Sequence, residues 1–368
     1  MFMSSLAVPI ADHVAKPGRA EQQLLIEAEK ARSFGKLMVA SVFESAARVL
    51  PDAPLMRDRM DEWPGDMAGA GVIFRLNAGL HALARSGRDP ALQRIYRAAA
   101  HGDLPAAQML DLALRDALNN RAQDLLEWMA GPTQTNEVAR VAGLAGVLME
   151  LNARAAMPVE LLELGASAGL NLNLSRYHCQ MGAAHCGPDA SPVQIAPRWI
   201  GRAVPQVPFA IARSIGVDPN PLDIGNAQDC ERLHAYIWPG EKERSARLAA
   251  ALELARRLPP RVDRGTASEW LPRQLARVQP PQMRRVVFHS MVVQYMSTQE
   301  REMVDAALSE AGQRAAPDRP LVRVGLEWTT DRTQVELHVT QWTGGDPESR
   351  VVARCHPYGE WFDWAGLG

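Results

Sequence analysis

Residues 158–177 read Pro-Val-Glu-Leu-Leu-Glu-Leu-Gly-Ala-Ser-Ala-Gly-Leu-Asn-Leu-Asn-Leu-Ser-Arg-Tyr. A mainly apolar run, 159–164, leads into a loop of small residues, 165–169, and then into a mixed segment that ends at Tyr177. This order predicts a buried strand, a tight turn and the N-terminus of a helix. Glycine and other small residues at such a junction let backbone N–H groups approach a ligand closely.

Two chemistries use a loop of this kind. Gly165-x-Ser167-x-Gly169 fits the nucleophile elbow of α/β-hydrolases, and Glu163-x-Gly165-x-Ser167-x-Gly169 resembles the first motif of class I S-adenosylmethionine (SAM) methyltransferases. A hydrolase elbow follows several strands, whereas about 130 largely helical residues precede this loop. That position favours the methyltransferase motif. The chain also contains residues in the order of a hydrolase triad, namely Ser167, then Asp218 or Asp263, then His289 or His356.

Composition and charge exclude several classes of protein. The chain has 368 residues, of which 47% are hydrophobic and 22% charged, as in an ordinary globular protein. Its net charge of −2 gives no general attraction to nucleic acid or to an anionic membrane. No apolar run approaches the ~20 residues of a membrane helix, and residues 1–20 lack a signal-peptide pattern. Because four cysteines do not indicate a disulfide scaffold, we expect a cytoplasmic protein.

The chain divides into two parts. From Arg19 to about Trp128 the apolar spacing predicts five or six helices and no strand, with a proline-marked loop at 51–64. The Gly131-Pro132 break separates a helical domain, 1–131, from an α/β domain, 132–368. Thr135 or Asn136 is expected to cap the helix that leads into the opening strand.

Strands and helices alternate after residue 158. This pattern predicts a mostly parallel sheet with helices on both faces, and a small β-excursion at 178–202. The last two strands, joined by residues 343–346, read as an antiparallel hairpin. Seven strands with this ending resemble the Rossmann-like class I methyltransferase sheet. The further strands are expected at 209–217, 261–266, 285–288, 321–328, 335–342 and 350–355.

The methyltransferase resemblance implies a cofactor site for SAM. Glu163, Gly165, Ser167 and Gly169 would form its cradle, and Asp218, which ends the second strand, would bind the ribose hydroxyls. Ala267 would flank the adenine at the end of the third strand. Two departures stand out. Ser167 replaces the usual central glycine, and Asp218 lies 53 residues after Gly165, where about 20 is usual.

The end of the fourth strand supplies catalytic candidates. His289 could deprotonate a substrate, because the pKa of histidine lies near neutrality, and Tyr295 is assigned to the catalytic site with it. Ser290 and Gln294 could bind substrate there. Asn136 and Glu137 could also bind substrate, by reaching over the cofactor pocket from the preceding helix.

Seven short phrases of the sequence carry a family resemblance: Gln134–Glu137, Glu163–Leu172, Gly216–Pro219, Tyr236–Pro239, Val287–Ser290, Gln294-Tyr295 and His356–Trp361. Together they resemble an uncharacterised prokaryotic family, domain of unknown function 2332. The family implies no established activity, so it supports the fold and leaves the reaction open. The resemblance spans roughly residues 20–366.

Two other groups of residues have weaker interpretations. His178-Cys179 and His185-Cys186 offer four zinc ligands, but their spacing is unlike common zinc motifs, so we predict no metal site. Most of the late tryptophans are expected in the core, although some could wall a pocket. They are Trp328, Trp342, Trp361 and Trp364.

Three functional hypotheses follow. The first is SAM-dependent methyl transfer to a small or peptide-like nucleophile. The second is a serine hydrolase that uses Ser167. The third is a non-catalytic protein that keeps the fold to bind a small ligand or to interact with a partner, and the serine in place of glycine keeps it open. We expect a small-molecule ligand, no nucleic acid and no membrane, and the sequence leaves the oligomeric state open.

Overall fold

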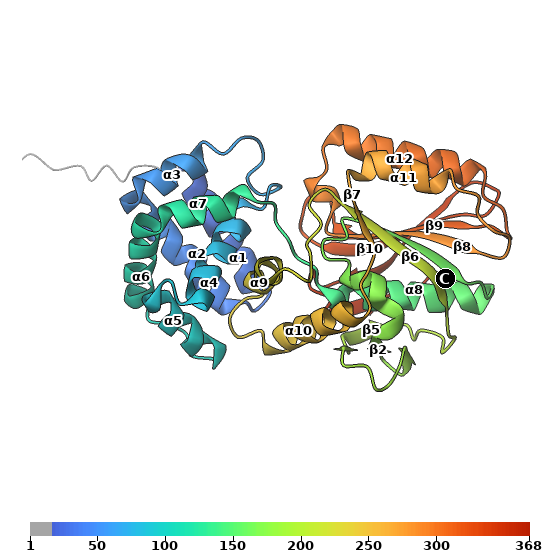
Figure 1. Cartoon of the computed structure of the whole chain (residues 1–368), viewed down its shortest axis with the longest axis horizontal. Coiled ribbons are helices and arrows are strands. Elements are labelled where there is room, and N and C mark those ends of the chain that lie inside the picture. The colour runs from blue at the N-terminus through green and yellow to red at the C-terminus, as the bar shows by residue number, and fades with distance from the viewer. Residues whose placement is uncertain (1–16) are drawn as a thin grey trace, which may run out of the picture.

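A computed structural model describes residues 17–368, which form a helical region beside an α/β region (Figure 1). The expectation of no signal peptide concerns residues that lie largely outside this range. One helix more than expected is present, because α3 occupies the stretch predicted as a loop. Pro54 is its first residue, where a missing N–H does no harm. The helices are α1 (Arg19–Ser33), α2 (Leu37–Val49), α3 (Pro54–Asp61), α4 (Val72–Ser86), α5 (Pro90–Ala100), α6 (Ala107–Asn120) and α7 (Ala122–Ala130).

A later helix, α9 (Ala227–Ala235), lies between the two regions (Figure 1). It contacts α4 of the helical region, while its residues Cys230 and Leu233 belong to the core of the α/β region. Ala235, Tyr236 and Trp238 belong to the same buried cluster as the cores of α2 and α4. The ring Nδ1 of His81 on α4 lies 3.0 Å from the carbonyl oxygen of Ala235. The helical region therefore takes part of its core from the C-terminal half of the chain.

One large sheet has nine strands in the order β5-β12-β11-β10-β9-β8-β1-β6-β7. Strands β7, β6, β1, β8 and β9 run parallel. Their order reverses at β1, as in doubly wound folds. The prediction of a large, mostly parallel sheet is confirmed, and β10 and β11 form the expected antiparallel pair. The strands are β1 (Val159–Leu164), β6 (Ile211–Asp218), β7 (Val262–Arg264), β8 (Arg284–Ser290), β9 (Leu321–Trp328), β10 (Val335–Trp342), β11 (Glu348–Cys355) and β12 (Trp361–Trp364).

The expected β-excursion is a three-stranded sheet of β2 (His178–Met181), β3 (Ala184–Cys186) and β4 (Gln194–Ile195). The strand that follows, β5 (Arg198–Gly201), leaves this small sheet and pairs with β12 at the edge of the large one. The large sheet is therefore wider than the seven strands that the sequence predicted.

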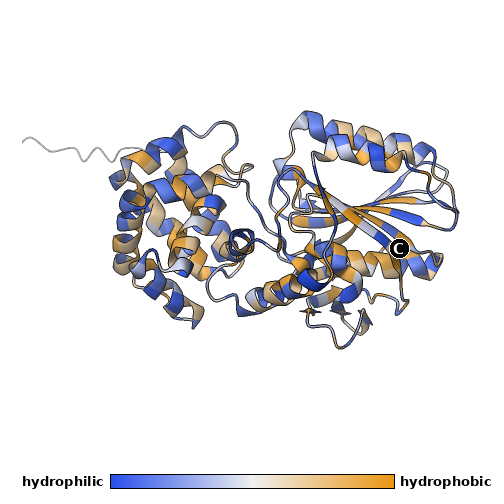
Figure 2. Cartoon of the chain, in the orientation of Figure 1, coloured by the Kyte–Doolittle hydropathy of each residue, from blue (hydrophilic) through white to orange (hydrophobic). Residues whose placement is uncertain are grey.

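Helices cover both faces of the sheet (Figure 1). Helices α8 (Val141–Arg154) and α10 (Lys242–Arg257) pack on one face, where Leu161 of β1 is buried. Helices α11 (Ala267–Leu275) and α12 (Thr298–Gln313) pack on the other, against Leu162 and Leu164. All six residues of β1 are buried, as expected of a central parallel strand. In Figure 2 the apolar colouring accordingly concentrates in the sheet and on the inner faces of the helices.

Two local predictions were wrong. The segment after Gly169 is a 3₁₀ segment, η3 (Leu170–Arg176), broken at Asn173, rather than an α-helix. Asparagine and serine side chains compete for backbone bonds in such a segment, and the Asn173 amide donates to the Leu258 carbonyl at 3.1 Å. The helix before β1 begins with a 3₁₀ turn, η2 (Val138–Arg140), which is capped by Glu137 rather than by Thr135 or Asn136.

Within residues 17–368, every helix is too short or too polar to cross a membrane.

Candidate functional site

A cleft of about 590 Å³ lies at the carboxyl ends of β1, β6 and β8, beside the point where the strand order reverses. Open α/β sheets bind ligands at this position. The cleft brings together most of the residues that the sequence predicted for the site. They are Gly165, Ser167, Asp218, Ala267, Ser290, Gln294 and Tyr295.

The loop after β1 has the backbone of a ligand cradle. Gly165 has a φ of +66°, and a Cβ on it would lie 2.4 Å from a methyl group of Val292. Only glycine fits there. Ser167 also has a positive φ, 54°, which is rare for a residue with a side chain. Surrounding hydrogen bonds hold Ser167 in this conformation.

Asp218 and Gln134 supply those bonds. The Ser167 N–H donates to Asp218 Oδ2 at 2.8 Å, and the Asn220 N–H donates to Oδ1 at 2.8 Å. Each Asp218 oxygen keeps a lone pair for another donor. The Ser167 hydroxyl donates to Gln134 Oε1 at 2.5 Å, and the Gln134 amide donates to the Asn220 carbonyl at 3.0 Å. Ser167 thus hydrogen-bonds to an amide rather than to a histidine, and this arrangement does not favour a serine nucleophile.

Glu163 lies beneath the loop and does not line the cleft. It is 2% exposed, and its Oε1 accepts from the Asn171 amide at 2.8 Å. Burial raises the pKa of Glu163 to about 8, against the effect of the Asn171 bond. Gly169 also packs away from the cleft, against Pro260 and Val262. These two residues therefore support the loop from behind.

Asn136 and Glu137 lie differently from the substrate-binding positions expected for them. Asn136 Oδ1 accepts the Leu170 N–H at 2.9 Å, so it fastens the far end of the loop. Glu137 accepts from Arg244 at 2.6 Å and from Arg247 at 3.2 Å. Although burial opposes it, these arginines lower the pKa of Glu137. Both side chains are buried, and neither lines the cleft.

His289 also lies outside the cleft lining. It is 3% exposed, with Nδ1 2.7 Å from Glu327 Oε1 and Nε2 accepting from Arg323 at 3.0 Å. Burial lowers the pKa of His289, so the ring is neutral at pH 7. With both nitrogens engaged, the expected general base has no free position for a substrate proton. Its neighbours Ser290, Gln294 and Tyr295 do line the cleft.

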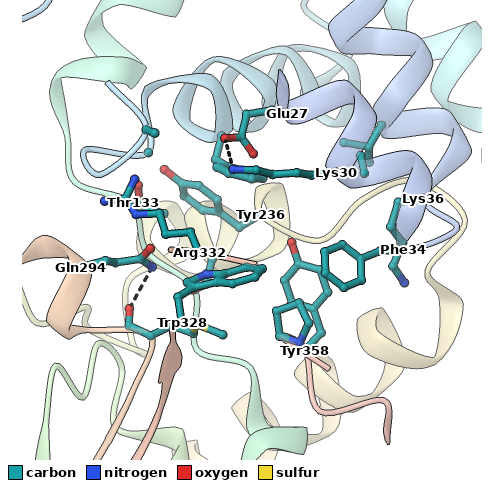
Figure 3. Close-up of a pocket in the computed structure, with 18 of the residues that line it drawn as sticks. Glu27, Lys30, Phe34, Lys36, Thr133, Tyr236, Gln294, Trp328, Arg332 and Tyr358 are labelled. Atoms are coloured by element: carbon teal, nitrogen blue, oxygen red, sulfur yellow. Dashed lines mark hydrogen bonds and ion pairs between the residues drawn. The ribbon is translucent and has the colours of Figure 1, made fainter. Parts of the chain in front are cut away.

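A second cavity, of about 130 Å³, adjoins the cleft between the helical and α/β regions. We call it the aromatic chamber. Figure 3 shows Phe34 just after α1, Tyr236 after α9, Trp328 of β9 and Tyr358 of the β11–β12 turn around it. The residues that line both cavities are Thr133, Thr135, Met291, Gln294, Tyr295 and Arg332.

Of the late tryptophans that could wall a pocket, Trp328 lines the chamber. The sequence predictions assigned no role to Arg140, Tyr236 and Tyr358, which also line only the chamber. Tyr236 and Tyr358 lie in two of the phrases that carry the family resemblance. Those phrases could have pointed to a second pocket. Arg140 lies outside all of these phrases, so the sequence did not indicate a role for it.

Among residues 17–368, no group of three or more His, Cys, Asp or Glu is arranged to hold a metal ion. His178 and His185 stack with ring centroids 5.9 Å apart. Cys179 and Cys186 face each other across β2 and β3 as free thiols.

The chain belongs to a family of uncharacterised proteins conserved in bacteria, DUF2332, whose family model matches residues 21–364. No curated protein and no solved structure matches the chain.

Proposed function

We propose that the protein is a SAM-dependent methyltransferase with its cofactor in the cleft beside Gly165. The observation that carries this proposal is the shared position of the glycine loop and Asp218, at the carboxyl ends of β1 and β6 in one cleft. The volume of about 590 Å³ lies within the range of small-ligand sites. The strand order β7-β6-β1-β8-β9 supports a methyltransferase-type core, to which β10, β11 and β12 add an antiparallel extension.

The residues present suit a cofactor that carries a ribose. Gly165 keeps the loop backbone open to the cleft, and the remaining lone pairs of Asp218 can accept ribose hydroxyls. Ala267, at the start of α11, leaves room for a flat ring beside it. When bound, SAM supplies an electrophilic methyl group for transfer to a nucleophile.

The chain contributes positioning rather than strong base catalysis. Thr133, Gln294 and Tyr295 stand where the cleft meets the aromatic chamber and can orient an acceptor. No histidine of the described residues lines either cavity. Within residues 17–368, Asp66 and Glu300 are the carboxylates of the cleft besides Asp218, and carboxylates are weaker bases than histidine. An acceptor that is already nucleophilic at neutral pH therefore suits the site.

Calorimetric titration with SAM and with S-adenosylhomocysteine tests the proposal. We expect both to bind the wild-type protein, and Asp218→Asn to weaken both about tenfold or more through the lost charged acceptor. Asp223→Asn is the matched control, because Asp223 is exposed on the same β6–α9 connection and does not line the cleft. If folded wild-type protein binds neither ligand at millimolar concentration, the proposal fails.

A further inference from the structure

The aromatic chamber combines an apolar wall with one buried cation. Its aromatic rings come from both regions of the chain (Figure 3). The other cations at its wall have partners. Lys30 pairs with Glu27, Lys36 with Glu241 and Glu360, and Arg332 with Asp66.

Arg140 differs from these residues. It is 4% exposed, and no carboxylate of residues 17–368 forms a salt bridge with it. Its Nε donates to the Pro357 carbonyl at 2.8 Å. Its two terminal nitrogens have no hydrogen-bond partner among residues 17–368, and they are not among the fully buried unpaired atoms. Because Arg140 lines the chamber, a ligand there can reach them. Burial lowers the pKa of Arg140, which reflects how poorly this charge is compensated. Buried charges are normally paired.

The chamber is held rigidly around this arginine. Gly359 has a φ of +68°, and a Cβ there would lie 2.9 Å from the backbone nitrogen of Arg140. The β11–β12 turn therefore packs directly on η2. Arg244 stacks 3.9 Å from the Tyr358 ring, and Glu137 holds Arg244 in place. A ligand would meet a preformed site.

We propose that the aromatic chamber binds a small aromatic or branched aliphatic carboxylate, whose carboxylate pairs with Arg140. The volume of about 130 Å³ suits a single ring, since an apolar cavity of roughly 150 Å³ is known to accept benzene. The guanidinium offers a planar, two-pronged donor that matches a carboxylate. Arg140 lines only the chamber, whereas Thr133 and Gln294 also line the cleft. The anchored ligand thus presents its other end to the cleft.

The Thr133 hydroxyl marks the junction of the two cavities. Thr133 Oγ1 is buried beside the hydroxyl groups of Tyr236 and Tyr295, but it forms no hydrogen bond of good geometry within residues 17–368. It can bond a polar group of the ligand at the mouth of the cleft. That this ligand is the methyl acceptor rests on the proposed function. The binding of the carboxylate does not.

Calorimetry with benzoate and its neutral isostere benzamide tests the site. Wild-type protein should bind benzoate at least about tenfold more tightly than benzamide. Arg140→Gln should remove that preference, and Arg140→Lys should keep part of it, because an ammonium lacks the planar fork. Arg354→Gln, an exposed arginine on β11, is the control for loss of one positive charge. Circular dichroism establishes that each variant is folded, and the wild-type comparison stands even if a variant does not fold.

Equal affinities for benzoate and benzamide in the wild type, or an unchanged preference in folded Arg140→Gln, would overturn the proposal. A carboxylate could also come from SAM itself. If benzoate competes with SAM and Arg140→Gln weakens SAM binding about tenfold, Arg140 serves the cofactor and the proposal falls. Binding of benzoate without binding of SAM would sink the methyltransferase proposal and leave the carboxylate site standing.

Discussion

At the scale of single residues, Glu163 shows how burial changes what a motif residue does. Glu163 Oε2 and Asn171 Oδ1 are both buried without a partner among the described residues. A proton on Glu163 Oε2 would turn that oxygen into a donor, and Asn171 Oδ1 is an acceptor that lacks one. Its raised pKa, about 8, agrees with a protonated acid in the folded protein near neutral pH. The sequence could identify Glu163 as a motif residue, but its protonation depends on how deeply the loop covers it.

This raised pKa predicts a pH-dependent stability. The ordinary pKa of 4.5 lies below the folded value of about 8, so the folded state binds the proton more tightly. The resulting stabilisation is fully present below pH 4.5 and is lost as the pH rises through 8. We expect a loss of a few kcal/mol, since one pKa unit corresponds to about 1.4 kcal/mol.

Urea unfolding at pH 5, 7 and 8.5 measures this loss. Glu163→Gln should flatten the dependence, whereas Glu302→Gln, at an exposed site on α12, should follow the wild type. Parallel curves for Glu163→Gln and the wild type would show that Glu163 is ionised in the folded protein.

At the scale of elements, the sequence predicted best the strands whose apolar residues form a clear local pattern, as the mostly buried run of β9 and the alternation of β10 do. The apolar patterns of β9 and β10 gave their bounds, 321–328 and 335–342, in agreement with the structure. Strand β12 was missed because Trp361–Trp364 is only four residues long and forms by pairing with β11 and β5. The helix expected after Gly169 was wrong because the local asparagines bond elsewhere. Pairing over long sequence distances leaves little trace in a local pattern.

The hydrogen bond between the 132–137 segment and the loop 165–169 can be measured as a coupling free energy between two substitutions. Gln134 and Ser167 hydrogen-bond across 33 residues of sequence. A double-mutant cycle of Gln134→Ala and Ser167→Ala, followed by urea unfolding, should give a coupling free energy of about 1 kcal/mol. The same cycle with Gln22→Ala, an exposed site on α1, should be additive. Additivity of the Gln134 pair would mean that this bond adds nothing to stability.

At the scale of the whole molecule, the helical and α/β regions are joined by partly buried ion pairs. Lys36, between α1 and α2, pairs with Glu241 before α10 and with Glu360 in the β11–β12 turn. Although burial acts against it, these two carboxylates raise the pKa of Lys36, so it is fully charged at neutral pH. The network continues through Arg244 to Glu137. No pattern within the sequence could predict contacts between such distant residues.

Removing the lysine should therefore weaken the whole protein. We expect Lys36→Met to lower the free energy of unfolding by about 1 kcal/mol, because it removes the cation that Glu241 and Glu360 share, although Glu241 keeps Arg244 as a partner. Urea unfolding at pH 7 measures this, with Lys242→Met at an exposed position of α10 as the control. An effect no larger than that of the control would show that the two regions do not depend on this network.

The path of α9 also has a mechanical consequence. The backbone passes from the helical region to the α/β region near residues 131–137. It returns toward the helical region before α9 and passes back to the α/β region near 236–241. Two of these crossings carry Thr133, Tyr236 and Trp238 at the wall of the aromatic chamber. If the two regions rotate against each other, the rotation axis is expected to run close to these backbone crossings. The chamber then lies at the hinge itself, where displacements are smallest, and the outer rim of the cleft is where the molecule would open and close.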